Sequence, residues 1–150
     1  MGLKEKLQSD LTEAIRNRDE LKAGTIRMVL AAIMNEQVAG KEAKVLTDDE
    51  IITVLSREAK KRREAVEAFT AAGRDDKAAT EKAEGDVIAT YLPAQLNDAE
   101  VEKLIADAIA QVGAAGPQDM GKVMGAIKGK IAGKADGSKV SAMVKAALSK

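Results

Sequence analysis

Apolar residues in the first half of the chain recur every three or four positions, which is the spacing of one face of a helix. A first helix is predicted with a core face of Leu3, Leu7, Leu11 and Ile15. A second helix, capped by Asp19 and ending near Gly40, is predicted with a core face of Leu21, Met28, Val29, Ala32 and Ile33. No useful length of sequence alternates between polar and apolar residues as a half-buried strand would.

Two further helices are predicted before residue 92. Thr47 and Glu50 have the spacing of a capping box, which predicts the start of a long helix that Gly73 closes. The core face of this helix is expected to hold Ile52, Leu55, Ala59, Val66 and Phe69. A fourth, alanine-rich helix is expected from about Asp76 to Tyr91, because the residue before Pro93 is disfavoured in helical conformation.

Three more helices are predicted after the Leu92–Pro93 step. Asn97 is expected to cap the first, which ends at Gly113 and buries Val101, Leu104, Ile105, Ala108, Ile109 and Val112. Pro117 suits the first turn of the second, which buries Met120, Met124, Ile127 and Ile131. Ser138 is a plausible cap for the last, which buries Val140, Met143, Val144, Ala147 and Leu148. The predicted fold is therefore all-α, with a four-helix N-terminal domain over residues 1–92 and a small three-helix C-terminal domain over residues 97–150.

Composition narrows the chemistry that the chain can perform. Its 150 residues are 45% hydrophobic, which is enough for a core, and its 24 basic residues balance 24 acidic ones. The chain has no histidine and no cysteine, so the commonest metal ligands, general bases and thiol nucleophiles are missing. We therefore expect no metal, no cofactor and no catalytic site in the chain acting alone. A charged start and the lack of a membrane-length apolar run predict a cytoplasmic protein with no membrane partner.

Positive charge is concentrated at the end of the chain. From Pro117 onwards seven lysines face only Asp119 and Asp136, a surplus of five positive charges. These lysines are Lys122, Lys128, Lys130, Lys134, Lys139, Lys145 and Lys150. Such a segment can contact phosphate groups although the whole chain is neutral, and a solvated lysine-rich helix face is the ordinary alternative. A second basic cluster, from Arg57 to Arg63, lies beside acidic neighbours and is interpreted as surface or interdomain salt bridging.

Glycines at positions 121, 125, 129 and 133 fall every four residues along the predicted sixth helix. Each costs roughly 1 kcal/mol relative to alanine inside a helix, so something is expected to come close to this smooth stripe. A neighbouring helix packs closely there, or the helix frays at Gly129 and Gly133, or the backbone of a ligand approaches directly. Spacing alone leaves these possibilities open.

Four stretches of the sequence resemble a known family. They are IRMVLAAI at 26–33, YLPAQL at 91–96, DMGKVMG at 119–125 and GKADG at 133–137. In this order and spacing they are similar to the GatB/YqeY family. Its members are stand-alone proteins and the C-terminal part of one subunit, GatB, of the amidotransferase that amidates Glu-tRNA(Gln) or Asp-tRNA(Asn). In that enzyme the region similar to this chain is helical and helps to hold the tRNA elbow, and the catalytic sites lie elsewhere.

The resemblance implies tRNA binding more than chemistry, although the family is associated with carbon–nitrogen ligase activity that uses glutamine as amido-N-donor. By analogy, RNA contact is expected at Lys122, Gly125, Lys130, Lys134, Gly137 and Lys139. No arginine follows Arg74, so recognition of RNA shape is favoured over reading of bases. Two alternatives stay open. One is a protein-interaction adaptor for a synthetase or amidotransferase subunit, using the glycine stripe with Met120 and Met124, and the other is an accessory part in amide transfer within a larger assembly.

Overall fold

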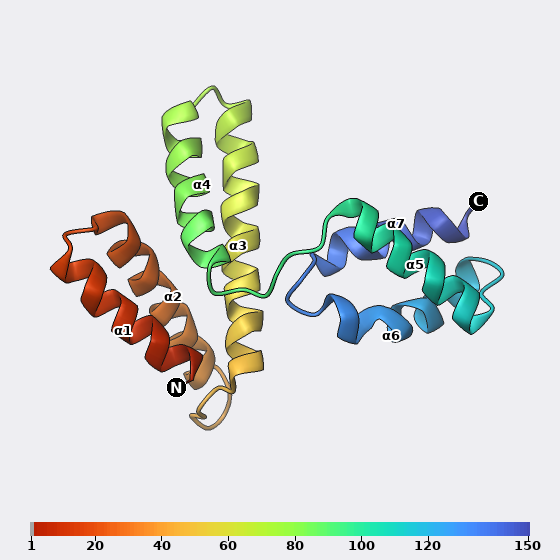
Figure 1. The fold of residues 1–150 in the computed structure, drawn as a ribbon, viewed down its shortest axis with the longest axis horizontal. Helices are drawn as coiled ribbons and strands as arrows, with labels where there is room; N and C mark the ends of the chain where they lie inside the picture. The colour runs from red at the N-terminus through yellow and green to blue at the C-terminus, as the bar shows by residue number, and fades with distance from the viewer. Residues whose placement is uncertain (1) are drawn as a thin grey trace. The chain divides into compact units, whose positions relative to one another are not determined.

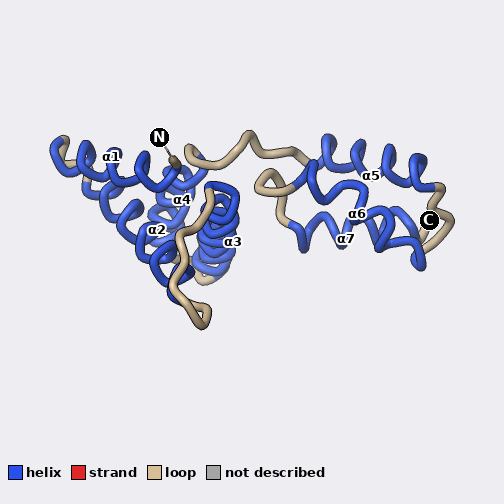
Figure 2. The backbone as a smooth tube through the Cα atoms, turned by 90° about the horizontal axis from the view of Figure 1, so that it is seen from below, coloured by secondary structure: helices blue, strands red, loops and turns tan. Residues whose placement is uncertain are grey.

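Helices make up the regular structure of residues 2–150, which are the residues that the computed structural model describes (Figures 1 and 2). Within them the chain forms seven α-helices and one short 3-10 helix, with no strand. The prediction of an all-α fold is confirmed. The chain divides into two compact units that meet at the junction of Leu92 and Pro93, and each unit is described by itself.

The first unit, which ends at Leu92, contains four helices, and two of their predicted caps are present. Asp19 accepts a hydrogen bond from the backbone N–H of Lys22, as predicted from its position. The predicted capping box is also present, because the side chains of Thr47 and Glu50 each accept the backbone N–H of the other. The helices are α1 (Leu3–Arg16), α2 (Glu20–Val38), α3 (Asp48–Ala71) and α4 (Asp75–Ala89).

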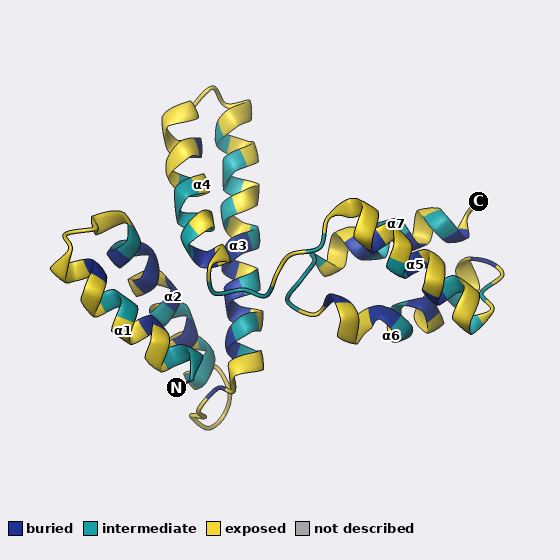
Figure 3. Ribbon diagram, in the orientation of Figure 1, coloured by how far each residue is buried: buried dark blue, intermediate teal, exposed yellow. Residues whose placement is uncertain are grey.

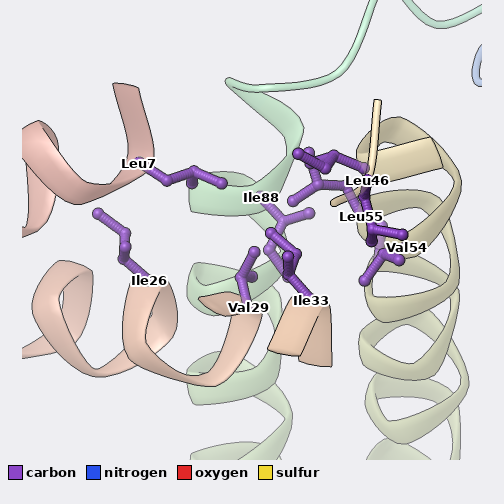
Figure 4. Close-up of a cluster of buried hydrophobic side chains, with 10 residues drawn as sticks. Leu7, Ile26, Val29, Ile33, Leu46, Val54, Leu55 and Ile88 are labelled. Atoms are coloured by element: carbon purple, nitrogen blue, oxygen red, sulfur yellow. The ribbon is translucent and has the colours of Figure 1, made fainter. Parts of the chain in front are cut away.

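All four helices contribute to a single apolar core in this unit (Figure 4). Leu7 comes from α1, Val29 from α2, Leu55 from α3 and Ile88 from α4, and each is at most 2% exposed. The remaining members of the cluster are Ile26, Ile33, Leu46, Ile51, Val54 and Ala59. The alternation of buried and exposed residues along each helix can be followed in Figure 3. Aliphatic packing of helices therefore holds the unit together, which fits a chain whose only aromatic residues are Phe69 and Tyr91.

The predicted core face of α2 was wrong at two positions. Leu21 and Met28 are 42% and 40% exposed, and Ile26, which the predicted stripe omitted, is buried in their place. The physical reason is that α2 carries apolar side chains on both of its faces, so spacing could not select which face turns inward. Ile15 of α1 is likewise 50% exposed although it was expected in the core.

Arg62 is a second correction, because it was expected at the surface with the rest of the cluster from Arg57 to Arg63 and is largely buried. Its side chain is only 11% exposed and pairs with Glu58 at 2.9 Å, and its Nε lies 3.4 Å from a carboxylate oxygen of Glu84. Lys61 also pairs with Glu58, at 2.9 Å, and Arg57 pairs with Glu36 at 3.3 Å. Much of the basic cluster from Arg57 to Arg63 is therefore paired within this unit, inside α3 and with its neighbours α2 and α4.

The last helix of the first unit ends two residues earlier than expected, at Ala89. Thr90 then begins a turn in which its hydroxyl donates to the carbonyl of Val87, at 2.7 Å. The turn places the Tyr91 hydroxyl 2.5 Å from the carboxylate of Asp10 in α1. Burial raises the pKa of Tyr91, and the hydrogen bond to Asp10 raises it further. Tyr91 therefore acts as a hydrogen-bond donor that ties the end of α4 to α1.

The second unit, from Pro93 to Lys150, is a three-helix arrangement with its own core. Asn97 caps α5 by accepting the backbone N–H of Glu100, and Gly113 ends that helix in the left-handed conformation, both as predicted. The helices are α5 (Asp98–Val112), the 3-10 helix η1 (Pro117–Asp119), α6 (Met120–Ile131) and α7 (Gly137–Leu148). Their buried residues are Val101, Ile105, Ala108, Val123, Ile127, Ile131, Val140, Val144 and Leu148. Pro117 opens the 3-10 turn that leads directly into α6.

Candidate nucleic-acid interface

The segment before α6 is held by Asp119, the first residue of the DMGKVMG stretch. Its carboxylate accepts the backbone N–H of Ala115 at 2.8 Å, and this hydrogen bond lowers the pKa of Asp119. Lys122 lies 3.7 Å from the same carboxylate and lowers that pKa further. Asp119 therefore ties the segment that precedes α6, at Ala115, to the first turn of the helix, at Lys122.

The YLPAQL and GKADG stretches meet in the structure, although they lie nearly forty residues apart. The side-chain amide of Gln95 donates to the carbonyl of Gly133 at 2.8 Å and to that of Pro93 at 2.7 Å. The backbone N–H of Leu96 donates to the carbonyl of Lys134 at 2.9 Å. The segment that enters α5 thus fixes the connection between α6 and α7, where Gly133 takes the left-handed conformation with φ of 71°.

The cap of α7 is Asp136 rather than Ser138, so the predicted cap was wrong by two positions. The Asp136 carboxylate accepts the backbone N–H of Ser138 at 3.0 Å, and the Asp136 carbonyl accepts that of Val140. Gly137 and Lys139 therefore occupy the first turn of α7, where both are exposed. The first turn of a helix presents backbone N–H groups to an anion, and here Asp136 already engages one of them.

Three of the predicted glycines line an open strip along α6, which we call the glycine face: Gly121, Gly125 and Gly129. All three are exposed, and a Cβ atom added at any of them would meet no atom within 4 Å. Within the second unit, therefore, no neighbouring helix packs against these glycines. Gly133, expected in the same helix, lies beyond its end at Ile131. Residues advance by about 100° around a helix, so Lys122 and Lys128 lie about 60° to either side of Gly125.

The remaining predicted contacts cluster at the connection between α6 and α7, which we call the lysine loop: Lys130, Lys134, Gly137 and Lys139. Lys130 and Lys139 are exposed and Lys134 is partly buried. Lys130 lies about 12 Å along α6 from Lys122 and about 140° around the helix from Gly125. The six predicted residues therefore form two groups on one unit rather than a single face.

Ion pairs engage two of the predicted lysines. Lys139 lies 2.8 Å from the carboxylate of Asp98 at the start of α5, with both side chains more than half exposed, and Lys122 pairs with Asp119. Lys128, Lys130 and Lys134 take part in none of the ion pairs found within residues 2–150. These three ammonium groups are therefore available to a phosphate without first breaking a pair.

Sequence reasoning missed two residues of this region and overestimated two others. Lys128 flanks the glycine face as closely as Lys122 does, and projecting α6 on a helical wheel would have found it. Asp98 lies 41 positions before Lys139, so no local pattern pointed to their pairing. Met120 and Met124 are partly buried against the core of the second unit. The methionines are therefore less available as a pliable protein-binding surface than predicted.

The described part of the chain offers neither a metal site nor a membrane span. No group of three or more acidic, histidine or cysteine side chains in residues 2–150 is arranged to hold a metal ion. No helix formed by these residues combines the length and the apolar character needed to cross a membrane.

Comparison with known proteins finds fungal relatives. The chain is 35% identical over 104 residues, 69% of its length, to "Altered inheritance of mitochondria protein 41, mitochondrial" of Eremothecium gossypii. It is 30% identical over 123 residues, 79% of its length, to the protein of the same name in Pyrenophora tritici-repentis. The matches span 56% and 65% of these relatives, so a large part of each relative has no counterpart in the match.

The names of these relatives contradict the cytoplasmic location predicted from the sequence, because each is called a mitochondrial protein. That prediction rested on a charged start and on the lack of a membrane-length apolar run. Neither of these features distinguishes one aqueous compartment from another, so they could not support the choice of the cytoplasm.

A family model identifies the chain as a whole, and it confirms the resemblance that the four sequence stretches indicated. The model, described as Yqey-like protein, matches residues 4–148, which include every helix except the first residue of α1. Three of the stretches that carry the resemblance also fix the fold of the second unit, at Asp119, Gln95 and Gly133. The chain belongs to the Yqey-like protein family.

Proposed function

We propose that this protein binds tRNA through its second unit, with the glycine face of α6 and the lysine loop against the phosphate backbone. The observation that carries the proposal is the open glycine face with Lys122 and Lys128 on its two sides. A strip without side chains lets a nucleic-acid backbone approach the helix closely, and flanking ammonium groups neutralise its phosphates. The family relationship supports the proposal, because related sequence in a tRNA amidotransferase subunit serves this purpose.

The chemistry of the surface favours recognition of RNA shape rather than of bases. All basic residues after Arg74 are lysines, which act as point charges and lack the bidentate geometry that selects guanine. The only aromatic residues of the chain, Phe69 and Tyr91, both lie in the first unit. The second unit therefore has no aromatic side chain on which an unpaired base could stack. Different tRNAs should therefore bind with similar affinity, and the affinity should fall steeply with salt concentration.

The two groups of residues are tested separately by fluorescence anisotropy with labelled tRNA. Gly125→Leu should weaken binding because its side chain enters the space that the RNA backbone would occupy, whereas the protein itself leaves that space open. Ala106→Leu, at an exposed position in the middle of α5, is the matched control and should bind as the wild type does. Circular dichroism should show unchanged helicity in both variants.

The lysine loop is tested by replacing Lys130, Lys134 and Lys139 with Gln together. The plot of log affinity against log salt should become shallower by about 0.7 to 0.9 for each phosphate that the variant no longer neutralises. Wild-type affinity and an unchanged salt slope in this variant would remove the lysine loop from the site. If Gly125→Leu also bound normally, the proposal that the second unit binds tRNA would be wrong.

We further propose that the protein acts by binding and does not catalyse amide transfer alone. The chain lacks cysteine and histidine, and its Ser and Lys residues do not lie in the glycine- and serine-rich loop that a serine–lysine amidase would need. Purified protein supplied with glutamine, ATP and Glu-tRNA(Gln) should form no Gln-tRNA. Turnover that persists through repeated purification would contradict this proposal, and co-purification with an amidase subunit would favour an accessory part in such an assembly.

An adaptor for a synthetase or amidotransferase subunit is the competing function. The partly buried positions of Met120 and Met124 weaken it, because they leave few apolar atoms on α6 for a protein partner. Salt separates the two functions, since apolar docking loses little affinity between low and moderate salt. A partner protein that binds α6 equally well across that range would favour the adaptor.

A further inference from the structure

Two consecutive peptide groups beside the lysine loop are held by the segment that enters α5. The side-chain amide of Gln95 donates to the carbonyl of Gly133, and the backbone N–H of Leu96 donates to that of Lys134. The Gly133 carbonyl belongs to the peptide group before Lys134, and the Lys134 carbonyl belongs to the peptide group after it. The two hydrogen bonds therefore restrain the backbone on both sides of a single lysine.

The side chain of Gln95 has the donors that this contact requires. It bridges the carbonyls of Pro93 and Gly133, at 2.7 and 2.8 Å, so both of its partners are acceptors. A primary amide carries two N–H donors on one nitrogen, and here each of them has a carbonyl partner. A side chain of similar length without such donors, for example that of methionine, cannot form this bridge.

Lys134 combines a restrained backbone with an available cation. It is partly exposed and takes part in none of the ion pairs found within residues 2–150. Its backbone N–H and that of Ala135 donate to the carbonyl of Ile131, at 2.9 and 3.1 Å, which connects it to the end of α6. Ordering a flexible residue during binding costs conformational entropy, and a residue that is already ordered avoids that cost.

We propose that Gln95 is a positioning residue for phosphate binding, because it keeps the backbone around Lys134 ordered in the free protein. This role rests on the proposed function, since it takes the lysine loop as a phosphate site. The segment from Pro93 to Leu96 also follows the junction of the two units, so RNA binding is coupled to the order of the chain at that junction. The coupling is reciprocal: loosening this segment weakens RNA binding, and bound RNA keeps the segment in place.

The direct test is Gln95→Met in the full chain, which removes the donors with little change in side-chain length and none in charge. Affinity for a labelled tRNA transcript, measured by fluorescence anisotropy, should fall about twofold to tenfold, the range that corresponds to one net hydrogen bond. Gln111→Met, at an exposed position of α5, is the matched control and should bind as the wild type does. Circular dichroism should show the same helicity in both variants.

A double-mutant cycle separates positioning from a general loss of stability. When Lys134 has been replaced by Gln, Gln95→Met should lose clearly less affinity, because the cation that Gln95 positions is then missing. A purely structural role would lower the affinity equally in both backgrounds. Hydrogen exchange at the Leu96 amide gives the reciprocal measurement, since saturating tRNA should slow it in the wild type and clearly less in Lys134→Gln.

Two sets of outcomes would overturn the role of Gln95, and they have different consequences for the proposed function. If the wild type does not bind tRNA, or if replacing Lys130, Lys134 and Lys139 with Gln leaves binding unchanged, the lysine loop is not a phosphate site and Gln95 has no cation to position. If that variant loses affinity but Gln95→Met binds as the wild type does, the lysine loop remains the site and the role of Gln95 is wrong. Equal losses with and without Lys134 lead to the same conclusion.

Discussion

Removing one carboxylate should strengthen tRNA binding if the lysine loop contacts phosphate. Asp98 lies 2.8 Å from the ammonium group of Lys139, so this lysine is engaged in the free protein and must leave Asp98 to reach a phosphate. Asp98→Asn releases Lys139 and removes a negative charge from the edge of the proposed site. A change on a different helix from the lysine loop should therefore increase affinity rather than reduce it.

The size of the effect follows from the exposure of the pair. The side chains of Lys139 and Asp98 are 60% and 66% exposed, and ion pairs in such surroundings contribute about 0.2 to 1 kcal/mol. Relief of that competition corresponds to an increase in affinity of about 1.4-fold to 5-fold. The increase should shrink as salt rises, because salt already screens the pair in the free protein.

Fluorescence anisotropy with one labelled tRNA measures the effect, and a double-mutant cycle assigns it. Asp98→Asn should gain affinity in the wild-type background and gain clearly less when Lys139 has been replaced by Gln, because the released cation is then missing. Glu102→Gln, at another exposed acidic position of α5, controls for the general loss of a negative charge. Equal gains with and without Lys139, or a loss of affinity in Asp98→Asn, would refute the reasoning.

Three further predictions concern the contacts that hold the two units together internally. Tyr91→Phe should lower the free energy of unfolding by about 1.5 kcal/mol at neutral pH, the lower end for a hydrogen bond to a charged group. The hydrogen bond from Tyr91 holds the pKa of Asp10 below its ordinary value of 3.8, so its contribution is present above that pH and is lost as the pH falls below it. Urea unfolding of the variant and the wild type should therefore converge in acid. Ile127→Ala, at a fully buried position, should lower the stability of the second unit by about 2 to 5 kcal/mol, which is as much as a core of this size supplies. NMR should then show the second unit unfolded and the first intact. Ile15→Ala, at a half-exposed position, should leave both units folded. Gln95→Ala removes two hydrogen bonds at the connection of α6 and α7, so proteolysis near residues 92–97 and hydrogen exchange at the Leu96 amide should both become faster; unchanged rates would mean that Gln95 does not hold this connection.

Local signals in the sequence were sufficient for the helices and most of their ends. Asp19, Thr47 with Glu50, and Asn97 each cap the helix that they were predicted to cap, because a capping bond involves residues three positions apart. Gly113 likewise ends α5 as predicted, since its left-handed conformation suits glycine. The prediction of Ser138 as the cap of α7 was wrong because Asp136, two positions earlier, is an equally favoured type of cap residue. The sequence alone does not show which of the two begins the helix.

Contacts between distant residues could not be predicted from local spacing. The inward face of α2 was misassigned because the helix has apolar residues all around, and only its packing against α1, α3 and α4 selects Ile26 over Leu21. The pairing of Lys139 with Asp98 and the contact of Gln95 with Gly133 span about forty residues each. For the site, the sequence identified lysines and glycines that are mostly exposed, but not that they form two groups or that Lys128 joins one of them.

The glycine face is the feature that links stability to function in the second unit. Gly121, Gly125 and Gly129 each weaken α6 by roughly 1 kcal/mol relative to alanine, about 3 kcal/mol together. The core of a unit of this size contributes only about 3 to 5 kcal/mol to the free energy of unfolding, so these glycines lower the stability of the second unit by a large fraction of that amount. Close packing would offset that loss, yet no other helix of the second unit occupies the space beside them. We propose that another molecule supplies the compensating contact, and the lysines on either side of the strip favour a partner with an anionic backbone.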